Sequence, residues 1–183
     1  KKIKKSMSWP GGKVVWMHCA SLGEFEQGRP VLKKIKEFYP DTFIVITFFS
    51  PSGYEIIKSD KEFSQVYYMP MDSSSNARKL IDIFKPTLVL WIKYEYWYYY
   101  LRELKDKNIP VLLISGVFLR SQPFFKWYGK FWKEMLEVFE HFFVQNNSSK
   151  DLLLTLVPEN KITISGDTRC DRVINVASGF IDV

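Results

Sequence analysis

Residues that build metal centres, disulfide frameworks and membrane spans are scarce in this chain of 183 residues. Its two cysteines, Cys19 and Cys170, lie near opposite ends, which is unlike a disulfide framework and fits a reducing compartment. The two histidines, His18 and His141, are far apart in sequence, which argues against a His/Cys metal site. The longest apolar run, residues 43–49, has the length of a strand, whereas a membrane span needs roughly 18 apolar residues. We therefore expect no metal, no disulfide framework and no membrane span in this sequence.

Common nucleotide-binding motifs are missing as well. The chain has neither the dinucleotide fingerprint G-x-G-x-x-G nor a P-loop lysine, so these two modes of binding lose support. It carries no secretion signal and does not begin with Met, and we expect it to be a piece of a longer protein.

Aromatic residues are abundant at 17%, and the net charge is +6. The length suits one globular domain, and the positive charge favours an anionic partner such as a phosphosugar, a nucleotide, a nucleic acid or an acidic membrane.

Strand-like and helix-like segments alternate along the chain. Apolar runs predict strands at Lys13–Cys19, Phe43–Phe49, Gln65–Met69, Thr87–Ile92, Val111–Ser115, His141–Gln145 and Lys161–Ser165. The segments between them predict helices at about Gln27–Tyr39, Gly53–Ser59, Ser74–Phe84, Trp97–Lys107, Phe124–Phe139 and Ser148–Leu156. This alternation is typical of a parallel sheet covered on both faces, and we predict a doubly wound, Rossmann-like α/β domain over residues 13–174, preceded by a basic leader at 1–12.

In such sheets ligands bind outside the carboxyl ends of the strands, so the loops after the strands form the candidate site. Glu24 follows the first predicted strand. Because Pro30 fits poorly inside a helix, we expect the helix to begin near residues 26–28 and Glu24 to lie in an irregular segment facing the cleft. The alternative is that Glu24 only complements the positive end of the helix dipole, an effect of roughly 0.3–1 kcal/mol.

Two further loops carry polar residues where a ligand would bind. After the second strand, Ser50, Ser52 and Gly53 suit a phosphate cradle, and an ordinary helix cap is the alternative. After the fourth strand, Lys93 and Glu95 lie within a block of aromatic residues. Aromatic surfaces with polar groups suit sugars and amphipathic lipids, and the alternative is that Glu95 is merely paired with a cation.

Three lysines recur at helical spacing in the predicted helix Phe124–Phe139, where they are surrounded by aromatic residues. They are Lys126, Lys130 and Lys133. A cationic stripe among aromatic residues fits a helix that lies on an anionic membrane surface. A buried aromatic face opposite a solvated lysine face is the alternative.

Four segments resemble one enzyme family in their order and spacing. They read WMHCASLGEFEQGRP, FFSPSGYE, KYEYWYYYLRELKDKNIP and SGDTRCDRV. They are similar to the amino-terminal half of 3-deoxy-D-manno-octulosonic acid (Kdo) transferases, which add Kdo to the lipid A precursor of lipopolysaccharide. The resemblance runs over residues 14–174 and implies the GT-B arrangement of two Rossmann-like domains facing each other across a cleft. This chain would be the amino-terminal domain, and residues 175–183 would begin the linker to a carboxy-terminal donor domain.

The resemblance also implies roles for individual residues. Glu24 would be the general base of an inverting transfer from CMP-Kdo to a hydroxyl of the lipid A precursor. The residues expected to hold this acceptor are Ser21, Gly23, Ser50, Ser52, Gly53, Lys93, Glu95 and Arg120. No cofactor or metal is implied, and CMP-Kdo would bind mainly to the other domain, so that this half alone is inactive. The protein would lie on the cytoplasmic face of the bacterial inner membrane, peripherally or through an anchor outside this sequence, with the three lysines as a dock and no nucleic acid as partner.

The sequence departs from the family at two places. Many relatives carry Glu-Thr-Glu-Leu-Trp after the fourth strand, where this chain has KYEYW, so that Lys93 replaces the first acid and is expected to contact an acceptor phosphate. Many relatives carry Asn-Ala-Arg after the fifth strand, where this chain has Ser-Gly-Val and Arg120 would supply the cation. Two other functions stay open: another GT-B glycosyltransferase with a different acceptor, and a non-catalytic module that binds a membrane or nucleic acid.

Overall fold

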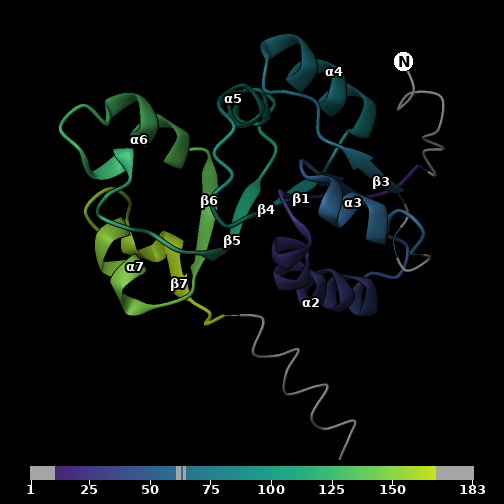
Figure 1. The fold of residues 1–183 in the computed structure, drawn as a ribbon, viewed down its shortest axis with the longest axis horizontal. Helices are drawn as coiled ribbons and strands as arrows, with labels where there is room; N and C mark the ends of the chain where they lie inside the picture. Colours follow the sequence, from purple (N-terminus) through teal and green to yellow (C-terminus); the bar gives the residue numbers. More distant parts are fainter. Residues whose placement is uncertain (1–10, 61–62, 64, 168–183) are drawn as a thin grey trace, which may run out of the picture.

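A computed structural model describes residues 11–60, 63 and 65–167, which form one twisted parallel sheet with helices on both faces (Figure 1). The seven strands are β1 (Val14–Cys19), β2 (Phe43–Phe48), β3 (Gln65–Tyr68), β4 (Leu88–Ile92), β5 (Val111–Gly116), β6 (Phe139–Val144) and β7 (Ile162–Ile164). Their order in the sheet is β3-β2-β1-β4-β5-β6-β7, and every pairing is parallel. The predicted doubly wound, Rossmann-like class is confirmed.

The helices divide between the two faces of the sheet. They are α2 (Leu22–Phe38), α3 (Pro51–Ile57), α4 (Ser74–Phe84), α5 (Tyr98–Asp106), α6 (Lys130–Leu136) and α7 (Asn147–Leu153), with short 3₁₀ helices η1 (Pro123–Phe125) and η2 (Glu159–Lys161). Buried residues of α2 and α3 share one core with one face of the strands, and those of α4 to α7 share the other core with the opposite face. Figure 1 shows α4 and α5 along the top and α2 along the bottom of the sheet.

Strand β1 shows why the sheet needs both layers. All six of its residues are buried, because successive side chains of a strand point to opposite faces. Trp16 enters the core beneath α4 and α5, where its ring meets Phe84 edge-on at a centroid distance of 5.6 Å. Met17 enters the core beneath α2, which approaches so closely that a Cβ added at Gly28 would lie 2.3 Å from the Met17 sulfur. A continuous apolar run is therefore the pattern that this central strand requires.

The start of α2 differs from the prediction. The helix begins at Leu22, five residues earlier than expected, and Glu24 lies in its first turn rather than in an irregular segment. Ser21 is the N-cap, and its side chain accepts the backbone N–H of Glu24 at 3.4 Å. This cap sets the helix start, and Pro30 is accommodated inside the helix, where it cannot donate a backbone hydrogen bond.

The single helix predicted over residues 124–139 is wrong. The segment divides into η1, a turn, α6 and the first residue of β6. At the turn the chain folds tightly on itself, since a Cβ added at Gly129 would lie 2.2 Å from the carbonyl oxygen of Pro123. Lys126 follows η1 in extended backbone, so it does not share a helical face with Lys130 and Lys133. The expected stripe of three lysines on one helix is thereby corrected.

Some predictions fall outside the described residues. These are most of the basic leader at 1–12, the last residues of the SGDTRCDRV segment, and the linker at 175–183. Within the described ranges, none of the helices combines the length and the apolar character needed to cross a membrane.

Candidate active site

The strand order points to one crevice at the carboxyl edge of the sheet. From β1 the chain builds outward to β2 and β3 on one side, and from β4 to β7 on the other. Ligands of doubly wound sheets bind at this switch point, here between the carboxyl ends of β1 and β4. The segment that leaves β1 contains Glu24, and the segment that leaves β4 contains Lys93 and Glu95. The structure thus brings together three of the predicted site residues, Glu24, Lys93 and Glu95, and we call the place where they meet the switch-point crevice.

Glu24 is fixed by the backbone that precedes it. Its Oε2 atom accepts the N–H of Ala20 at 2.5 Å, while its own N–H donates to Ser21. This reciprocal arrangement resembles a capping box, in which a glutamate in the first turn folds back over the helix start. The carboxylate is consequently held beside the carboxyl end of β1. Glu24 does lie in the first turn of α2, where its charge complements the positive end of the helix dipole. The hydrogen bond from Ala20 also fixes the direction of the carboxylate.

Burial raises the pKa of Glu24, and the negative charge of Glu95 raises this pKa further. The backbone N–H of Ala20 and the charge of Lys93 oppose these effects without cancelling them. A carboxylate with a raised pKa is a stronger base, and such perturbed groups in a crevice are candidates for proton transfer.

Glu95 has the opposite electrostatic character. Burial alone would raise its pKa, but interaction with His18 and a hydrogen bond from Trp97 outweigh burial and leave the pKa of Glu95 below its ordinary value. Its Oε2 atom accepts the Trp97 Nε1–H at 2.5 Å and lies 3.7 Å from His18 Nε2. Trp91 donates its indole N–H to the backbone oxygen of Glu95. The crevice therefore contains two carboxylates whose pKa values are moved in opposite directions.

Lys93 lies at the turn directly after β4. Its φ of 59° is in the left-handed region, and its backbone N–H bonds to the oxygen of Ile114 at 3.1 Å. Ser115, near the end of the neighbouring strand β5, has a φ of 57°. Strained backbone of this kind clusters at ligand-binding positions, which supports the assignment of this edge. The positive charge of Lys93 lowers the pKa of Glu24 and so favours its ionised form.

The loop after β2 has a structural explanation of its own. Ser50 caps α3 by accepting the Ser52 N–H at 3.3 Å, and the two hydroxyls lie 3.0 Å apart. A Cβ added at Gly53 would lie 2.1 Å from the Phe48 ring, so close packing requires glycine there. By contrast, a Cβ at Gly23 would meet only the Ser21 hydroxyl, at 3.9 Å. The expectation that these residues bind an acceptor stays a prediction.

Arg120 lines a pocket of about 690 Å³ beyond the end of β5. The lining residues are Phe118, Leu119, Arg120, Phe125, Lys126, Ser148, Asp151, Leu152 and Thr155. We call this the Arg120 pocket. In the part of the chain that the structure describes, neither Arg120 nor Lys126 forms an ion pair. Lys126 therefore lines the same pocket as Arg120 and does not lie beside the lysines of α6. The sequence does not predict this position, because its pattern favours a helix that continues through Gly129.

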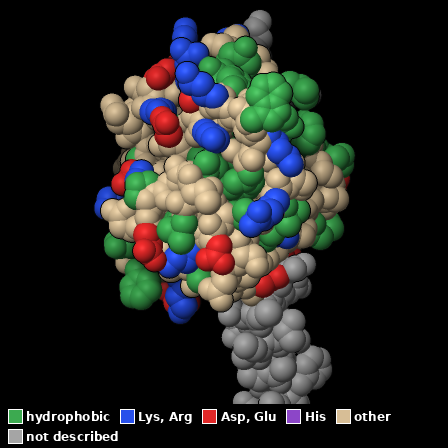
Figure 2. All heavy atoms as spheres, turned by 90° about the vertical axis from the view of Figure 1, so that its left-hand side faces the viewer, with side chains coloured by type: hydrophobic (Ala, Val, Ile, Leu, Met, Phe, Trp, Pro, Cys, Tyr) green, Lys and Arg blue, Asp and Glu red, His purple; other side chains and the backbone are tan. Residues whose placement is uncertain are grey.

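Aromatic side chains next to this pocket are open to solvent. Trp127 is 95% exposed, Tyr128 55% and Phe131 45%. Lys130 and Lys133 of α6 are exposed in the same stretch. We call these five residues the aromatic–lysine surface. Figure 2 faces the side of the molecule on which α6 and α7 lie, and hydrophobic side chains gather beside Lys and Arg side chains in its upper right. The alternative of a buried aromatic face is wrong for these three aromatic residues.

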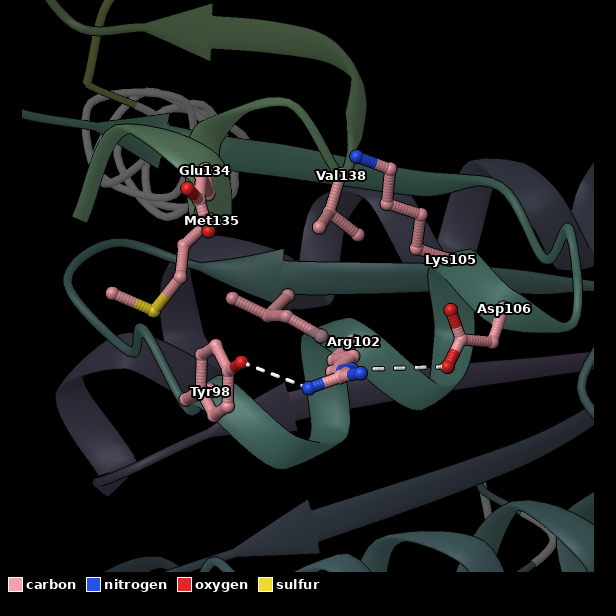
Figure 3. Close-up of a pocket in the computed structure, with 8 residues that line it drawn as sticks. Tyr98, Arg102, Lys105, Asp106, Glu134, Met135 and Val138 are labelled. Atoms are coloured by element: carbon pink, nitrogen blue, oxygen red, sulfur yellow. Dashed lines mark hydrogen bonds and ion pairs between the residues drawn. The ribbon is translucent and has the colours of Figure 1, made fainter. Parts of the chain in front are cut away.

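A second pocket, of about 340 Å³, lies between α5 and the α6 region (Figure 3). Three of its charged groups, Arg102, Lys105 and Asp106, are engaged with one another or with neighbours. Arg102 donates to the Tyr98 hydroxyl at 3.1 Å and approaches Asp106 at 4.0 Å, and Lys105 pairs with Glu137 at 3.1 Å. These contacts leave a groove between packed helices, and it shares no lining residue with the switch-point crevice.

The thiol of Cys19 lies near the crevice. Burial and the charges of Glu24 and Glu95 raise the pKa of this thiol well above its usual range, which favours the protonated form over the nucleophilic thiolate. Across residues 11–60, 63 and 65–167, no cluster of three or more His, Cys, Asp or Glu side chains is arranged to hold a metal ion. Glu24 and Glu95 are the two ionisable groups of this site whose pKa values are moved in opposite directions.

Comparisons with known proteins give a consistent result. The sequence profile of the family described as 3-Deoxy-D-manno-octulosonic-acid transferase (kdotransferase) matches residues 1–172. A 3-deoxy-D-manno-octulosonic acid transferase of Haemophilus influenzae is 28% identical over 175 residues, covering 92% of this chain and 40% of that protein. A bifunctional glycosyltransferase/methyltransferase of Fusobacterium nucleatum is 28% identical over 146 residues, covering 78% of this chain and 23% of that protein. The chain therefore spans less than half the length of these curated relatives.

Among solved structures, the fold is similar to that of UDP-GlcNAc 2-epimerase from Neisseria meningitidis bound to UDP-GlcNAc. The TM-score is 0.69 at 16% sequence identity, and the match covers 94% of this chain and 51% of that chain. At this identity the likeness concerns the fold, and it extends over one half of the other chain.

Proposed function

The chain belongs to the 3-deoxy-D-manno-octulosonic-acid (Kdo) transferase family, and we propose that it is the acceptor-binding half of an inverting Kdo transferase in which Glu24 is the general base. The donor would be CMP-Kdo and the acceptor a hydroxyl of the lipid A precursor, in lipopolysaccharide biosynthesis. CMP-Kdo would bind mainly to a second domain, because the relatives are more than twice as long as the stretch they share with this chain. This half would then be inactive alone.

The reaction needs a base because a sugar hydroxyl is a weak nucleophile at neutral pH. As the hydroxyl oxygen attacks the anomeric carbon of Kdo, the bond from that carbon to the CMP phosphate breaks and CMP leaves as an anion. The hydroxyl proton passes to the Glu24 carboxylate. A positioned base of this kind contributes roughly 10²–10⁴-fold to the rate.

The observation that carries this proposal is the pair of unlike carboxylates at the switch point. Glu24 is held in place by the Ala20 N–H and has a raised pKa, which suits it to accept a proton. Glu95 has a lowered pKa and stays ionised, which suits it to accept hydrogen bonds from acceptor hydroxyls. Lys93 adds a positive charge beside them, where it would contact a phosphate of the acceptor.

The remaining contacts to the acceptor are proposed along the same edge of the sheet. Ser21 and Gly23 follow the carboxyl end of β1. Ser50, Ser52 and Gly53 follow the carboxyl end of β2. Arg120, with Lys126 now beside it, would bind a further phosphate in the Arg120 pocket, whose walls include the apolar side chains of Phe125 and Leu152. An anionic, amphipathic molecule is complementary to this combination of unpaired cations and apolar walls.

The aromatic–lysine surface would place the protein on the cytoplasmic face of the bacterial inner membrane. Exposed aromatic rings enter the interface between headgroups and acyl chains, and lysines interact with anionic lipids. Trp127, which is 95% exposed, would enter furthest. Lys130 and Lys133 remain part of the proposed membrane dock, whereas Lys126 is assigned to the Arg120 pocket.

The test is transfer of Kdo from CMP-Kdo to a lipid A precursor by the full-length protein and its Glu24→Gln variant. Glutamine keeps an oxygen that can accept the Ala20 N–H, so the fold is retained while the base is lost. We expect a loss of about 10²–10⁴-fold in kcat. The matched control is Glu26→Gln, two residues along the same helix, which weakens an ion pair to Arg29 at 3.9 Å and should stay within about threefold of the parent.

Two results would overturn the proposal. A folded Glu24→Gln variant with near-parental activity would reduce Glu24 to a helix cap. A full-length protein that transfers no Kdo, yet binds polynucleotides or anionic vesicles with a steep dependence on salt, would favour the non-catalytic binding module.

A further inference from the structure

His18 is a buried polar residue for which the proposed reaction gives no role. It lies in β1 with no exposed surface, opposite Thr47 of β2 and Trp91 of β4. Its ring lies 4.9 Å from the Trp91 ring and 5.5 Å from the Trp97 ring, measured between centroids. These contacts hold the imidazole in one orientation. Its two nitrogens therefore face two different and fixed partners.

The first partner is Thr47, and it determines where the imidazole proton lies. The indole nitrogen of Trp16 can only donate, and it does so to Thr47 Oγ1 at 2.8 Å. His18 Nδ1 lies 2.9 Å from the same oxygen. In the part of the chain that the structure describes, Thr47 Oγ1 makes no other hydrogen bond, so the Thr47 proton has His18 Nδ1 as its acceptor. Since Nδ1 accepts, a neutral imidazole carries its proton on Nε2.

The second partner is Glu95. His18 Nε2 lies 3.7 Å from Glu95 Oε2, which is longer than a hydrogen bond but close enough for an N–H dipole on Nε2 to favour the ionised carboxylate. Nε2 makes no hydrogen bond to any other described residue. With the proton on Nε2, a positive edge faces the carboxylate. The opposite tautomer would direct a lone pair at the carboxylate and would leave the buried Thr47 proton without an acceptor, so both ends of the chain of contacts favour the same tautomer.

We propose that His18 is a positioning residue: Thr47 holds it as the Nε2–H tautomer, and it fixes the ionised carboxylate of Glu95 so that the charge of Glu95 remains beside Glu24. The polar chain runs from Trp16 to Thr47, His18 and Glu95, and it connects the interior of the sheet with the crevice. The tautomer assignment is independent of the proposed function. Only the consequence for catalysis rests on Glu24 being the base.

The consequence follows from the charges around Glu24. Glu95 faces it from the β4 segment and raises its pKa, Lys93 faces it from the same segment and lowers its pKa, and the neighbouring Cys19 thiol stays protonated. If His18 can no longer stabilise the charge of Glu95, that carboxylate becomes easier to protonate. A neutral Glu95 no longer repels the ionised form of Glu24, so the pKa of Glu24 falls.

The first experiment determines the tautomer by ¹⁵N NMR of the imidazoles. The chain contains only two histidines, so a His141→Gln variant identifies the His18 signals. At neutral pH we expect the Nε2–H tautomer for His18. A Thr47→Val variant, which keeps the shape but removes the hydroxyl, should increase the share of the other tautomer. An Nδ1–H tautomer in the parent protein would overturn the proposal.

The second experiment separates positioning from packing. His18→Gln retains an N–H near the position of Nε2, whereas His18→Leu does not. We expect the ¹³C-detected titration midpoint of Glu95 to rise by about half a pH unit or more in the Leu variant and to stay near the parental value in the Gln variant. In the full-length protein, the acid limb of kcat/KM should move to lower pH in the Leu variant and be restored in the Gln variant.

The outcomes distinguish this inference from the proposed function. A folded Leu variant with an unchanged Glu95 midpoint would contradict the inference, as would a loss of activity that leaves the acid limb in place. If the Leu variant does not fold, the Thr47→Val variant and the Gln variant still test the tautomer and the Glu95 midpoint. If the full-length protein transfers no Kdo, the proposed function fails, but both NMR results stand.

Discussion

The switch-point crevice and the aromatic–lysine surface belong to the same domain but hold their charges in different ways. In the crevice, Glu24 is fixed by a backbone N–H at 2.5 Å, and Glu95 is fixed by an indole N–H at the same distance. On the aromatic–lysine surface, within the described part of the chain, Lys130 and Lys133 form no ion pair and lie among exposed rings. In the function that we propose, the crevice transfers a proton at defined atoms, and the aromatic–lysine surface contacts a broad anionic partner.

The comparison predicts that substitutions in the crevice change chemistry and pH dependence, whereas substitutions at the basic surfaces change only affinity. Among substitutions that leave the proposed base Glu24 in place, the largest effect is expected for Glu95→Gln in the full-length protein. Removing its charge lowers the pKa of Glu24, so the acid limb of kcat/KM should move to lower pH, and the plateau should fall about 10–100-fold as base strength and an acceptor contact are lost. A pH–rate profile measures both changes. The control is Glu159→Gln, which removes one partner of an exposed ion pair with Lys150. An acid limb of kcat/KM that stays at the same pH in Glu95→Gln would contradict the electrostatic coupling between Glu95 and Glu24.

Two glycines of α2 sharpen the contrast between the open crevice and the packed sheet. Gly28→Ala should lower the free energy of unfolding by about 1–3 kcal/mol, because the new methyl group collides with Met17. Gly23→Ala has free space, and alanine is the better helix former, so the free energy of unfolding should rise by up to about 1 kcal/mol. Urea denaturation of the chain measures both. Equal destabilisation by the two substitutions would show that Gly23 also lies in a packed environment.

Arg120→Ala is expected to weaken binding of the acceptor without affecting the chemical step. Loss of a charge-assisted hydrogen bond to a phosphate should raise KM for the phosphorylated acceptor about tenfold and leave kcat unchanged. The matched control is Arg102→Ala, because Arg102 is already engaged with Tyr98 and Asp106 and should leave KM as it is (Figure 3). A fall in kcat at constant KM would place Arg120 in the chemical step instead.

The smallest effect is expected on the aromatic–lysine surface. One lysine near an anionic membrane contributes about 1 kcal/mol, so Lys130→Gln should reduce binding to anionic vesicles about fivefold at low salt. Sedimentation with vesicles rich in anionic lipid measures the change, and Lys34→Gln, whose lysine pairs with Glu37 at 2.6 Å on α2, is the control. If the two variants bind equally well, this surface is not the membrane dock.

The central strands could be predicted because their sequence has one physical solution. Runs such as residues 14–19 and 43–48 are apolar without alternation except at His18 and Thr47, and a strand covered on both faces buries them. The start of α2 differs from the prediction because the cap formed by Ser21 and Glu24, and not Pro30, determines where the helix begins. Residues 124–139 show a helical recurrence of lysines, but a tight turn at Gly129 and the pairing of Phe139 with Val111 decide the structure there.

The candidate site could be predicted only where its residues follow directly from strand ends. Glu24, Lys93 and Glu95 were found in this way, since loops after adjacent strands meet at one edge. The role of His18 could not be predicted, because Thr47 and Glu95 lie far from it in sequence and become its partners only through the order of the strands. The position of Lys126 beside Arg120 likewise depends on where the loop after β5 folds back.

The most direct test of the account is a ¹³C-detected titration of the side-chain carboxyls of Glu24 and Glu95 in this chain, assigned with the Glu24→Gln and Glu95→Gln variants. The account predicts that Glu95 ionises below the ordinary range for glutamate and Glu24 above it, and that the midpoint of Glu24 falls when Glu95 is replaced. Coincident midpoints, or a Glu24 that ionises before Glu95, would contradict the claim that this crevice separates the two carboxylates into a base and a permanent anion.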